Sequence, residues 1–312
     1  MTRENYRILV IILKKVGEIL LTTPVFRELH KLYPHAEITV VVDKGYKDVL
    51  LGNPYINHLF LLDPHDSPIT LLKKAVNLRK HNFNITIDVL SIPRSALISL
   101  ISGSPIRYGR NKRIRKYAYN HFFTSFPEIT PYIADRRLNV VRELGGLPDT
   151  TKLDFSIDEL STQKGKETLI VNGIYPNDRY ITISPVSLVK SKLWAFEKYA
   201  TLADYIISKK EYKVILVCGP HEYHFLQKVI DYMKYQPSAA LEFHQLKVFG
   251  YVLREACLHI GNDGGIKHLA SAVGVPTLTV FGPSNANVWN ENNDPKHIAL
   301  WKEISCRQRK CH

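Results

Sequence analysis

Five residues with acid–base or anion-binding side chains stand at or soon after places where an apolar run of the sequence ends in a turn. They are Glu18, Lys192, Glu222, Asp263 and His268. A carboxylate can accept a proton from a hydroxyl group, and a lysine can stabilise a negatively charged phosphate. In open α/β sheets, ligands bind at the carboxyl ends of the strands, where such residues would gather. The spacing therefore predicts a site for a phosphate-containing ligand.

Residues 257–283 combine a short strand, a glycine-rich turn, a helix and a second strand in the sequence CLHIGNDGGIKHLASAVGVPTLTVFGP. The turn at 261–265 contains residue types that tolerate unusual backbone angles. Apolar residues then recur at helical spacing, and Gly274 and Pro276 end the helix. Such a turn presents backbone N–H groups and the positive end of a helix dipole to a nucleotide phosphate. The pattern also fits a βαβ unit without a ligand, and the turn alone leaves both interpretations open.

Strand-like and helix-like segments alternate along the whole chain, which predicts an α/β fold with parallel sheets covered by helices. We expect strands at 7–13, 37–43, 58–62, 84–89, 180–184, 213–218, 258–260 and 277–281. Helices are expected at 19–33, 69–80, 135–144, 194–208, 221–234 and 250–256, and after the turn at 261–265. The glycine- and proline-containing segment 145–149 is the predicted domain boundary. It gives two Rossmann-like domains, 1–148 and 149–312.

Composition restricts the class of protein. With 312 residues, 45% hydrophobic and 23% charged, the sequence is that of a globular protein large enough for two domains. It contains no apolar run long enough to span a bilayer, and its start does not resemble a signal peptide, so we expect a cytosolic protein. Four cysteines, Cys218, Cys257, Cys306 and Cys311, are too few for a disulfide framework.

The net charge of +13 indicates an anionic partner, such as a phosphorylated substrate, an acidic membrane surface or a nucleic acid. Six basic residues and no acid lie within 107–116, RYGRNKRIRK, and aromatic residues follow. We interpret this run as a cradle for an anionic substrate or lipid head group. The alternative is a solvated loop.

Four motifs make the sequence resemble glycosyltransferase family 9, the ADP-heptose:lipopolysaccharide heptosyltransferases. They are VGEILLTTPVFRELHKLYP at 16–34, the K-x-W motif at 192–194, CGPHE at 218–222 and NDGGIKHLASAVGVPTLTVFGP at 262–283. They occur in the family's order along nearly the whole chain. The resemblance implies a GT-B architecture, with two facing Rossmann-like domains and an interdomain cleft. The acceptor would bind the N-terminal domain, and the nucleotide sugar the C-terminal domain.

The resemblance also implies catalytic roles. Glu18 would be the base that takes the proton of the acceptor hydroxyl, and an ordinary glutamate is ionised at neutral pH. Without the resemblance, an acid that stabilises the start of the first helix would be the simpler interpretation. Lys192 would stabilise the leaving diphosphate, although surface lysines are common.

Donor binding would involve Ser187, Glu222, Asp263, Gly264, Gly265 and His268. The N–H groups of Gly264, Gly265 and Ile266 would contact phosphate, whereas Asp263 would cap the helix or hold donor hydroxyls. Glu222 would bind ribose or adenine, or only open its helix. His268 would contact phosphate or sugar, or only fill the core.

The anionic acceptor would bind to basic side chains of the first domain, namely Lys14, Arg107, Arg110 and Arg113. No acidic cluster suggests a metal site, and a helix dipole with a lysine can replace Mg²⁺. We therefore expect neither metal nor cofactor, with ADP-heptose as the donor substrate.

Three features depart from the family pattern. The family usually has Asp where this chain has Glu18, and Ser or Thr where it has Gly264. The chain ends at Cys306–His312, where family members commonly continue into a further helix. The two terminal cysteines and His312 could bind a metal, but free thiols are the simpler expectation.

The sequence thus predicts an inverting, metal-independent heptosyltransferase that acts on a lipopolysaccharide inner-core acceptor, at the cytosolic face of a bacterial inner membrane. It would contact the membrane surface peripherally and bind no nucleic acid, because no recognised nucleic-acid module is present. Transfer from another nucleotide sugar or to another acceptor, and a non-catalytic nucleotide-sugar binder, remain alternatives. The sequence does not determine the oligomeric state.

Overall fold

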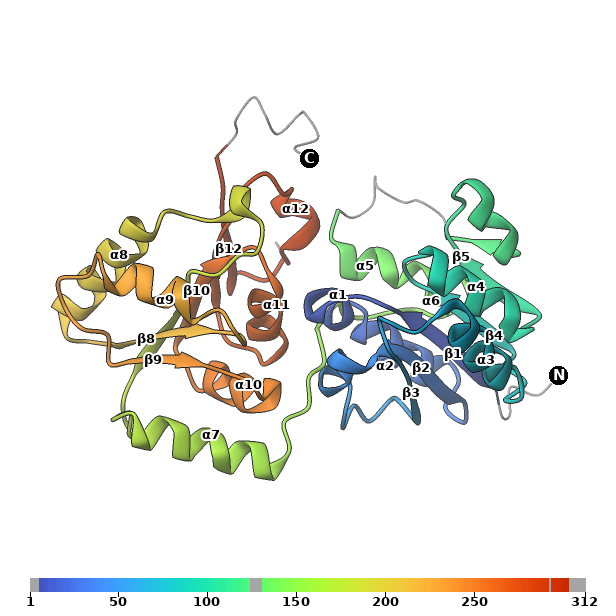
Figure 1. The fold of residues 1–312 in the computed structure, drawn as a ribbon, viewed down its shortest axis with the longest axis horizontal. Helices are drawn as coiled ribbons and strands as arrows, with labels where there is room; N and C mark the ends of the chain where they lie inside the picture. The colour runs from blue at the N-terminus through green and yellow to red at the C-terminus, as the bar shows by residue number, and fades with distance from the viewer. Residues whose placement is uncertain (1–5, 124–130, 292, 303–312) are drawn as a thin grey trace. The chain divides into compact units, whose positions relative to one another are not determined.

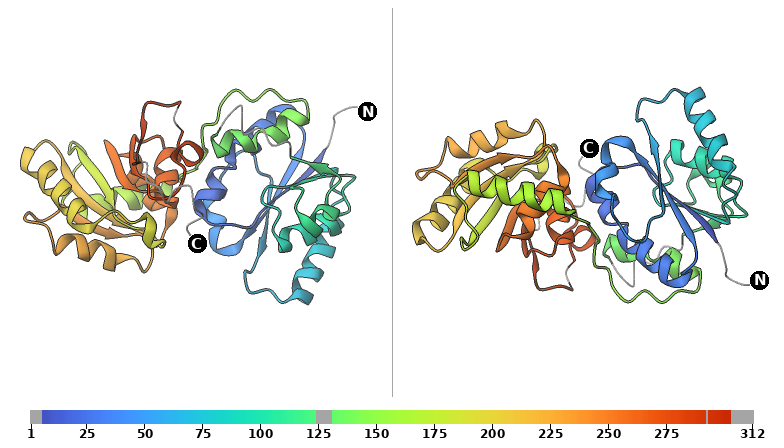
Figure 2. Two further views of the ribbon diagram at one scale, coloured as in Figure 1. Left: turned by 90° about the horizontal axis from the view of Figure 1, so that it is seen from above. Right: turned by 90° about the horizontal axis from the view of Figure 1, so that it is seen from below.

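The computed structural model describes residues 6–123, 131–291 and 293–302, and the chain forms two compact units, Met1–Asp154 and Phe155–His312. Each unit contains a six-stranded sheet whose strand pairings are parallel. Helices flank both faces of each sheet in the views of Figure 1 and Figure 2. Each unit is therefore an α/β domain of the Rossmann type, as the alternating sequence pattern predicts.

The N-terminal unit contains the following elements in chain order: β1 (Arg7–Ile12), α1 (Val16–Leu20), α2 (Thr23–Leu32), β2 (Glu37–Asp43), η1 (Lys44–Val49), β3 (His58–Leu62), α3 (Pro68–Arg79), β4 (Ile85–Asp88), α4 (Pro93–Ser102), β5 (Ile106–Gly109), η2 (Arg113–Ala118), β6 (His121–Phe122), α5 (Ile133–Arg137) and α6 (Asn139–Glu143). Its strand order is β3-β2-β1-β4-β5-β6.

The C-terminal unit contains α7 (Glu159–Val171), β7 (Tyr180–Ser184), η3 (Lys190–Lys192), α8 (Phe196–Lys209), β8 (Lys213–Cys218), α9 (Tyr223–Ile230), β9 (Ala239–Glu242), α10 (Leu246–Arg254), β10 (Leu258–Asn262), α11 (Gly265–Ala272), β11 (Thr277–Val280), α12 (Ala286–Trp289) and β12 (His297–Leu300). Its strand order is β12-β11-β10-β7-β8-β9.

The two units share one strand order. Numbered within its own unit, each sheet runs 3-2-1-4-5-6, so the direction of winding reverses next to the first strand. The reversal falls between β1 and β4 in the N-terminal unit and between β7 and β10 in the C-terminal unit. Ligands of open α/β sheets bind outside the carboxyl ends of the strands at such switch points.

Buried strands form the two cores. Residues 8–12 of β1 and 214–218 of β8 are fully buried, as expected for strands covered on both faces. Leu9 and Ile11 pack with Leu71, Ala75 and Leu78 of α3 and with Ile98 of α4. Successive side chains of a strand point to opposite faces, so Ile8, Val10 and Ile12 face the other side.

Two predicted helices are each divided in the structure. The segment 19–33 forms α1 and α2, because the chain breaks at Leu21 and Thr22 and Pro24 then occupies the first turn of α2, where its missing N–H costs nothing. Segment 135–144 forms α5 and α6, which meet at Leu138. The helices α4, α7 and α12 and the strands β5, β6, β9 and β12 were not predicted from the sequence.

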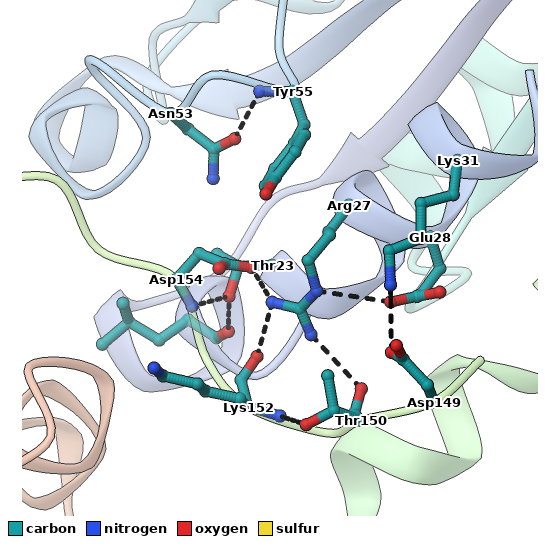
Figure 3. Close-up of polar contacts among 11 residues, drawn as sticks. Thr23, Arg27, Glu28, Lys31, Asn53, Tyr55, Asp149, Thr150, Lys152 and Asp154 are labelled. Carbon is teal, nitrogen blue, oxygen red and sulfur yellow. Dashed lines mark hydrogen bonds and ion pairs between the residues drawn. The ribbon is translucent and has the colours of Figure 1, made fainter. Parts of the chain in front are cut away.

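The segment that leaves the N-terminal unit is fixed by Arg27 of α2 (Figure 3). Its guanidinium donates to the carbonyl oxygens of Thr150 and Lys152 at 3.2 and 2.9 Å, and to the Asp154 carboxylate at 2.5 Å. The Asp154 N–H donates in turn to the Thr23 hydroxyl at 2.8 Å. The predicted domain boundary lies after residue 148, and the compact unit in the structure extends to Asp154, the residue that pairs with Arg27.

We predict that Arg27→Met lowers the free energy of unfolding by about 3 kcal/mol, because it breaks a buried ion pair and leaves the Asp154 carboxylate without this partner, while Glu28 keeps its pair with Lys31. Urea titration followed by circular dichroism measures the change. Lys31→Met is the matched control, since Lys31 pairs with Glu28 and Asp149 but its side chain is 48% exposed. Equal losses in the two variants would contradict the role of Arg27.

Candidate active site

The N-terminal switch point presents Glu18. After β1, Lys14 and Lys15 are exposed, and α1 begins at Val16 with Glu18 in its first turn. The Glu18 side chain is 26% exposed, so its carboxylate can reach a substrate. A negative charge is also favourable in the first turn of a helix.

Arg137, the last residue of α5, binds both the side chain and the main chain of Glu18. Its guanidinium donates to the Glu18 carboxylate and to the Glu18 carbonyl oxygen, and also to the Thr22 hydroxyl at 2.8 Å. The Arg137 side chain is only 5% exposed. Burial lowers the pKa of Arg137, whereas the neighbouring Glu18 charge raises it. Nothing in the sequence pattern pointed to Arg137, because it lies 119 residues from Glu18.

The next strand at this switch point ends in a buried acid, Asp88. Its carboxylate accepts hydrogen bonds from the Ser91 N–H at 2.8 Å and the Tyr119 hydroxyl at 2.6 Å. Burial raises the pKa of Asp88, and the Tyr119 hydrogen bond opposes that shift. The acidic end of the run NITID was a signal that sequence reasoning could have used.

The basic run at 107–116 is anchored beside Asp88. The Arg110 N–H donates to the Ser91 hydroxyl at 2.8 Å, and Arg115 donates to the Ser91 carbonyl oxygen at 2.8 Å. The run is therefore not a plain loop, since it includes part of β5 and part of η2.

The four predicted acceptor-binding residues differ in their surroundings. Lys14 and Arg113 are exposed, and Arg110 is close enough to Arg137 for its charge to lower the pKa of Arg137. Arg107, in contrast, donates to the carbonyl oxygens of Ser104 and Ala118, which fixes its guanidinium within its own unit.

The C-terminal switch point joins the segment after β7 to the end of β10. Lys192 Nζ donates to the Asp263 carboxylate at 2.6 Å, and the Trp194 N–H donates to the Asn262 side chain at 3.0 Å. The Asp263 side chain is 3% exposed and the Lys192 side chain 26% exposed. An ammonium group has three donors, so Lys192 retains hydrogen-bonding capacity for a phosphate while Asp263 orients it.

Gly282 allows this arrangement. A Cβ atom at residue 282 would lie 2.4 Å from the Ser191 carbonyl oxygen and 2.9 Å from Lys192 Cα. The loop after β11 therefore packs against the backbone that carries Lys192, and only glycine permits the approach.

The helix α11 starts at this edge. Gly264, and not Asp263, is its N-cap residue, and it makes no side-chain cap. The interpretation of Asp263 as the helix cap was therefore wrong, and Asp263 pairs with Lys192 instead. The first N–H groups of a helix have no partner within it and attract anions.

Gly264 has an extended backbone with φ of −169°, and a Cβ there would meet only one atom, at 3.9 Å. Gly264 therefore does not need the unusual backbone angle that its residue type suggested.

The remaining predicted donor residues lie along the same edge. Ser187 exchanges hydrogen bonds with Val189, and Glu222 accepts one from the Gly219 N–H at 3.0 Å. His268 is buried in α11, with its ring 6.4 Å from that of Trp289. Whether these residues bind a donor stays a prediction. Cys306, Cys311 and His312 lie outside the described residues.

Lys267, which sequence reasoning passed over, is buried beside His268. It is 1% exposed and its Nζ donates to the Trp289 carbonyl oxygen at 2.7 Å, which joins α11 to α12. Burial lowers the pKa of Lys267 to about 8, and the Asp263 charge opposes that shift.

Within the described ranges, no three His, Cys, Asp or Glu side chains cluster in a way that could hold a metal ion. None of the described helices is both long and apolar enough to cross a membrane.

Comparison with known proteins identifies a family. Residues 71–312 match the family model "Glycosyltransferase family 9 (heptosyltransferase)". Lipopolysaccharide heptosyltransferase 1 of Campylobacter coli is 27% identical over 96% of this chain and 91% of its own length. The crystal structure of a family 9 glycosyl transferase from Veillonella parvula superposes with a TM-score of 0.88, at 26% identity over 97% of this chain and 89% of that one. E. coli heptosyltransferase WaaC with ADP-2-deoxy-2-fluoro heptose shares the fold, with a TM-score of 0.71 at 18% identity over 95% of this chain and 93% of that one.

We predict that Lys267 makes stability depend on pH. Between about pH 8 and 10.5 the unfolded chain keeps the Lys267 proton and the folded chain has lost it, so stability rises with pH by up to about 1.4 kcal/mol per unit. Below pH 8 both states are protonated and this dependence disappears.

The measurement is the difference in unfolding free energy between Lys267→Met and the wild type at pH 7 and pH 9.5. The unfolding free energy of Lys267→Met minus that of the wild type is expected to be higher at pH 7 than at pH 9.5, because only the wild type gains stability from the Lys267 titration between these pH values. A difference that does not change with pH would rule out a buried, titrating Lys267.

Proposed function

Because the chain belongs to glycosyltransferase family 9 and is therefore a glycosyltransferase, we propose that it transfers a heptose from ADP-heptose to an inner-core lipopolysaccharide acceptor. The Campylobacter relative is named a lipopolysaccharide heptosyltransferase, and the E. coli neighbour was solved with a fluorinated ADP-heptose. The observation that carries the proposal is an accessible carboxylate, Glu18, at one switch point and an accessible lysine, Lys192, at the other.

The C-terminal unit would bind the donor. Lys192 and the first N–H groups of α11 would face the diphosphate, and a positive helix end favours such an anion. As the glycosidic bond to the diphosphate breaks, negative charge grows on the leaving oxygen, and these groups would stabilise it. This arrangement supports transfer without a metal ion, because the charge of Lys192 and the dipole of α11 act where Mg²⁺ would otherwise be needed.

The N-terminal unit would activate the acceptor. The Glu18 carboxylate would take the proton of the acceptor hydroxyl while the hydroxyl oxygen attacks the anomeric carbon. Attack on the face opposite the diphosphate in a single displacement inverts the configuration at that carbon. Lys14, Arg110 and Arg113 would attract the anionic acceptor.

Two variants should separate the two roles. Glu18→Gln is expected to bind ADP-heptose with unchanged affinity and to lose about 100-fold or more in turnover, because the amide cannot accept the hydroxyl proton. Lys192→Met is expected to weaken donor binding about tenfold or more, because a charge-assisted hydrogen bond of about 1.5–3 kcal/mol is lost. ADP release with a Kdo-lipid A acceptor gives turnover, and calorimetry gives the donor affinity.

The matched controls are Glu37→Gln, at the amino end of β2, and Lys190→Met, two residues before Lys192 in η3. Both should behave like the wild type. Near-normal turnover of Glu18→Gln would refute the base, and unchanged donor affinity of Lys192→Met would refute the phosphate contact. A thermal-shift panel of ADP-, UDP- and GDP-sugars identifies the donor: stabilisation by a UDP- or GDP-sugar alone would overturn ADP-heptose.

We also propose peripheral contact with an anionic membrane surface, at the cytosolic face of the bacterial inner membrane where such an acceptor would be met. The support is η2, in which Ile114 and Tyr117 are 79% and 71% exposed next to the exposed cations Lys112 and Arg113. Exposed apolar and aromatic side chains among cations fit an interface of lipid head groups and acyl chains.

Vesicle sedimentation tests this contact. The wild type should bind phosphatidylglycerol vesicles better than phosphatidylcholine vesicles, and Lys112→Ala should lower the partition about fivefold, since one basic residue near such a surface contributes about 1 kcal/mol. Ile114→Asp should weaken vesicle binding further. Val171→Asp, which changes an equally exposed residue of α7, should leave vesicle binding unchanged. Equal binding to both kinds of vesicle would contradict the proposal.

A further inference from the structure

Arg137 makes three contacts that converge on one stretch of chain, although it lies far away in the sequence. Its guanidinium donates to the carboxylate of Glu18, to the main-chain carbonyl oxygen of Glu18 and to the hydroxyl of Thr22. The Thr22 hydroxyl itself donates to the Glu18 carbonyl oxygen at 3.0 Å. Both the backbone and the side chain of Glu18 are therefore held.

The helix that carries Glu18 has little else to fix it. The helix α1 has five residues, its N-cap residue Lys15 makes no side-chain cap, and it ends where the chain breaks before α2. Such short helices are not stable by themselves. A glutamate on this helix has several rotatable bonds, so its carboxylate needs an external partner to occupy one position.

We propose that Arg137 is the positioning residue for Glu18, holding one carboxylate oxygen so that the second is presented to the acceptor hydroxyl. This inference rests on the proposed role of Glu18 as the base. Arg137 would not touch the substrate, and it acts through Glu18 alone.

An arginine suits this task. Its planar guanidinium is always charged near neutral pH and offers several donors in a rigid arrangement, so it can bond a carboxylate and a carbonyl oxygen together. A misplacement of about 1 Å at a reacting group can cost about 100-fold in rate.

The charged and titratable surroundings of Arg137 are Glu18, Arg110 and Tyr132. Arg110 repels Arg137, and Glu18 is the acid that compensates the buried guanidinium. A purely structural ion pair would have the same geometry. It would change stability when broken, but it would leave kcat unchanged.

The test compares Arg137→Met, Arg137→Lys and Glu18→Gln by kcat and kcat/KM, with donor affinity and melting temperature measured for each. For Arg137→Met we expect kcat to fall about 100-fold with unchanged donor affinity. For Arg137→Lys we expect partial rescue, with kcat about tenfold below the wild type, because the cation remains but lacks the planar arrangement of donors that reaches both groups of Glu18.

The matched control is Arg142→Met, which removes an arginine that joins α6 to Asp135 of α5 and also donates to Asn139 of its own helix. It should lower stability slightly and leave kcat as in the wild type. If Arg137→Met does not fold, Arg137→Lys and Thr22→Val test the positioning role instead. Each removes some of the hydrogen bonds that fix Glu18, so each is expected to lower kcat.

The outcomes separate the two claims. Normal turnover in Glu18→Gln would overturn the base, and the role of Arg137 with it. An inactive Glu18→Gln together with wild-type kcat in the Arg137 variants would overturn the positioning role alone.

Discussion

The strand order of the two parallel sheets decides where chemistry can occur in this chain. Each sheet reverses its winding next to its first strand, between β1 and β4 and between β7 and β10. At these positions the connections leave the carboxyl edge in opposite directions, so a ligand can approach the backbone there. At the first reversal Glu18 follows β1 and Asp88 ends β4, whereas Lys192 and Asp263 follow the strands at the second. The buried strands serve to place these four residues.

Each switch point contains one ion pair in which one partner is buried and the other is presented. Arg137 is buried and Glu18 is partly exposed, whereas Asp263 is buried and Lys192 is partly exposed. Burying one charge is costly unless it is paired, so the buried partner fixes the exposed one. The exposed groups have opposite charges, which suits a reaction that needs a base for one substrate and a cation for the other.

Much of the fold was predictable, because buried parallel strands contain uninterrupted apolar runs such as residues 8–12 and 214–218. The helix breaks at Leu21–Thr22 and Leu138 were missed, since the apolar spacing continues through them. Glu18, Lys192 and the start of α11 could be found because they follow strands. Arg137 and the Lys192–Asp263 pair could not, because these contacts join distant parts of the chain and depend on strand order. Gly264 was misinterpreted because residue type indicates which backbone angles are possible, and not which one the chain adopts.

The most direct test of this account is a crystal structure of the protein with a non-transferable ADP-heptose analogue and an acceptor. In that structure we expect the diphosphate to contact Lys192 Nζ and the first N–H groups of α11. The acceptor hydroxyl should lie within hydrogen-bonding distance of one oxygen of the Glu18 carboxylate, while Arg137 still binds the other oxygen of that carboxylate. A diphosphate bound elsewhere, or an acceptor hydroxyl facing a different base with Glu18 remote from it, would contradict the account.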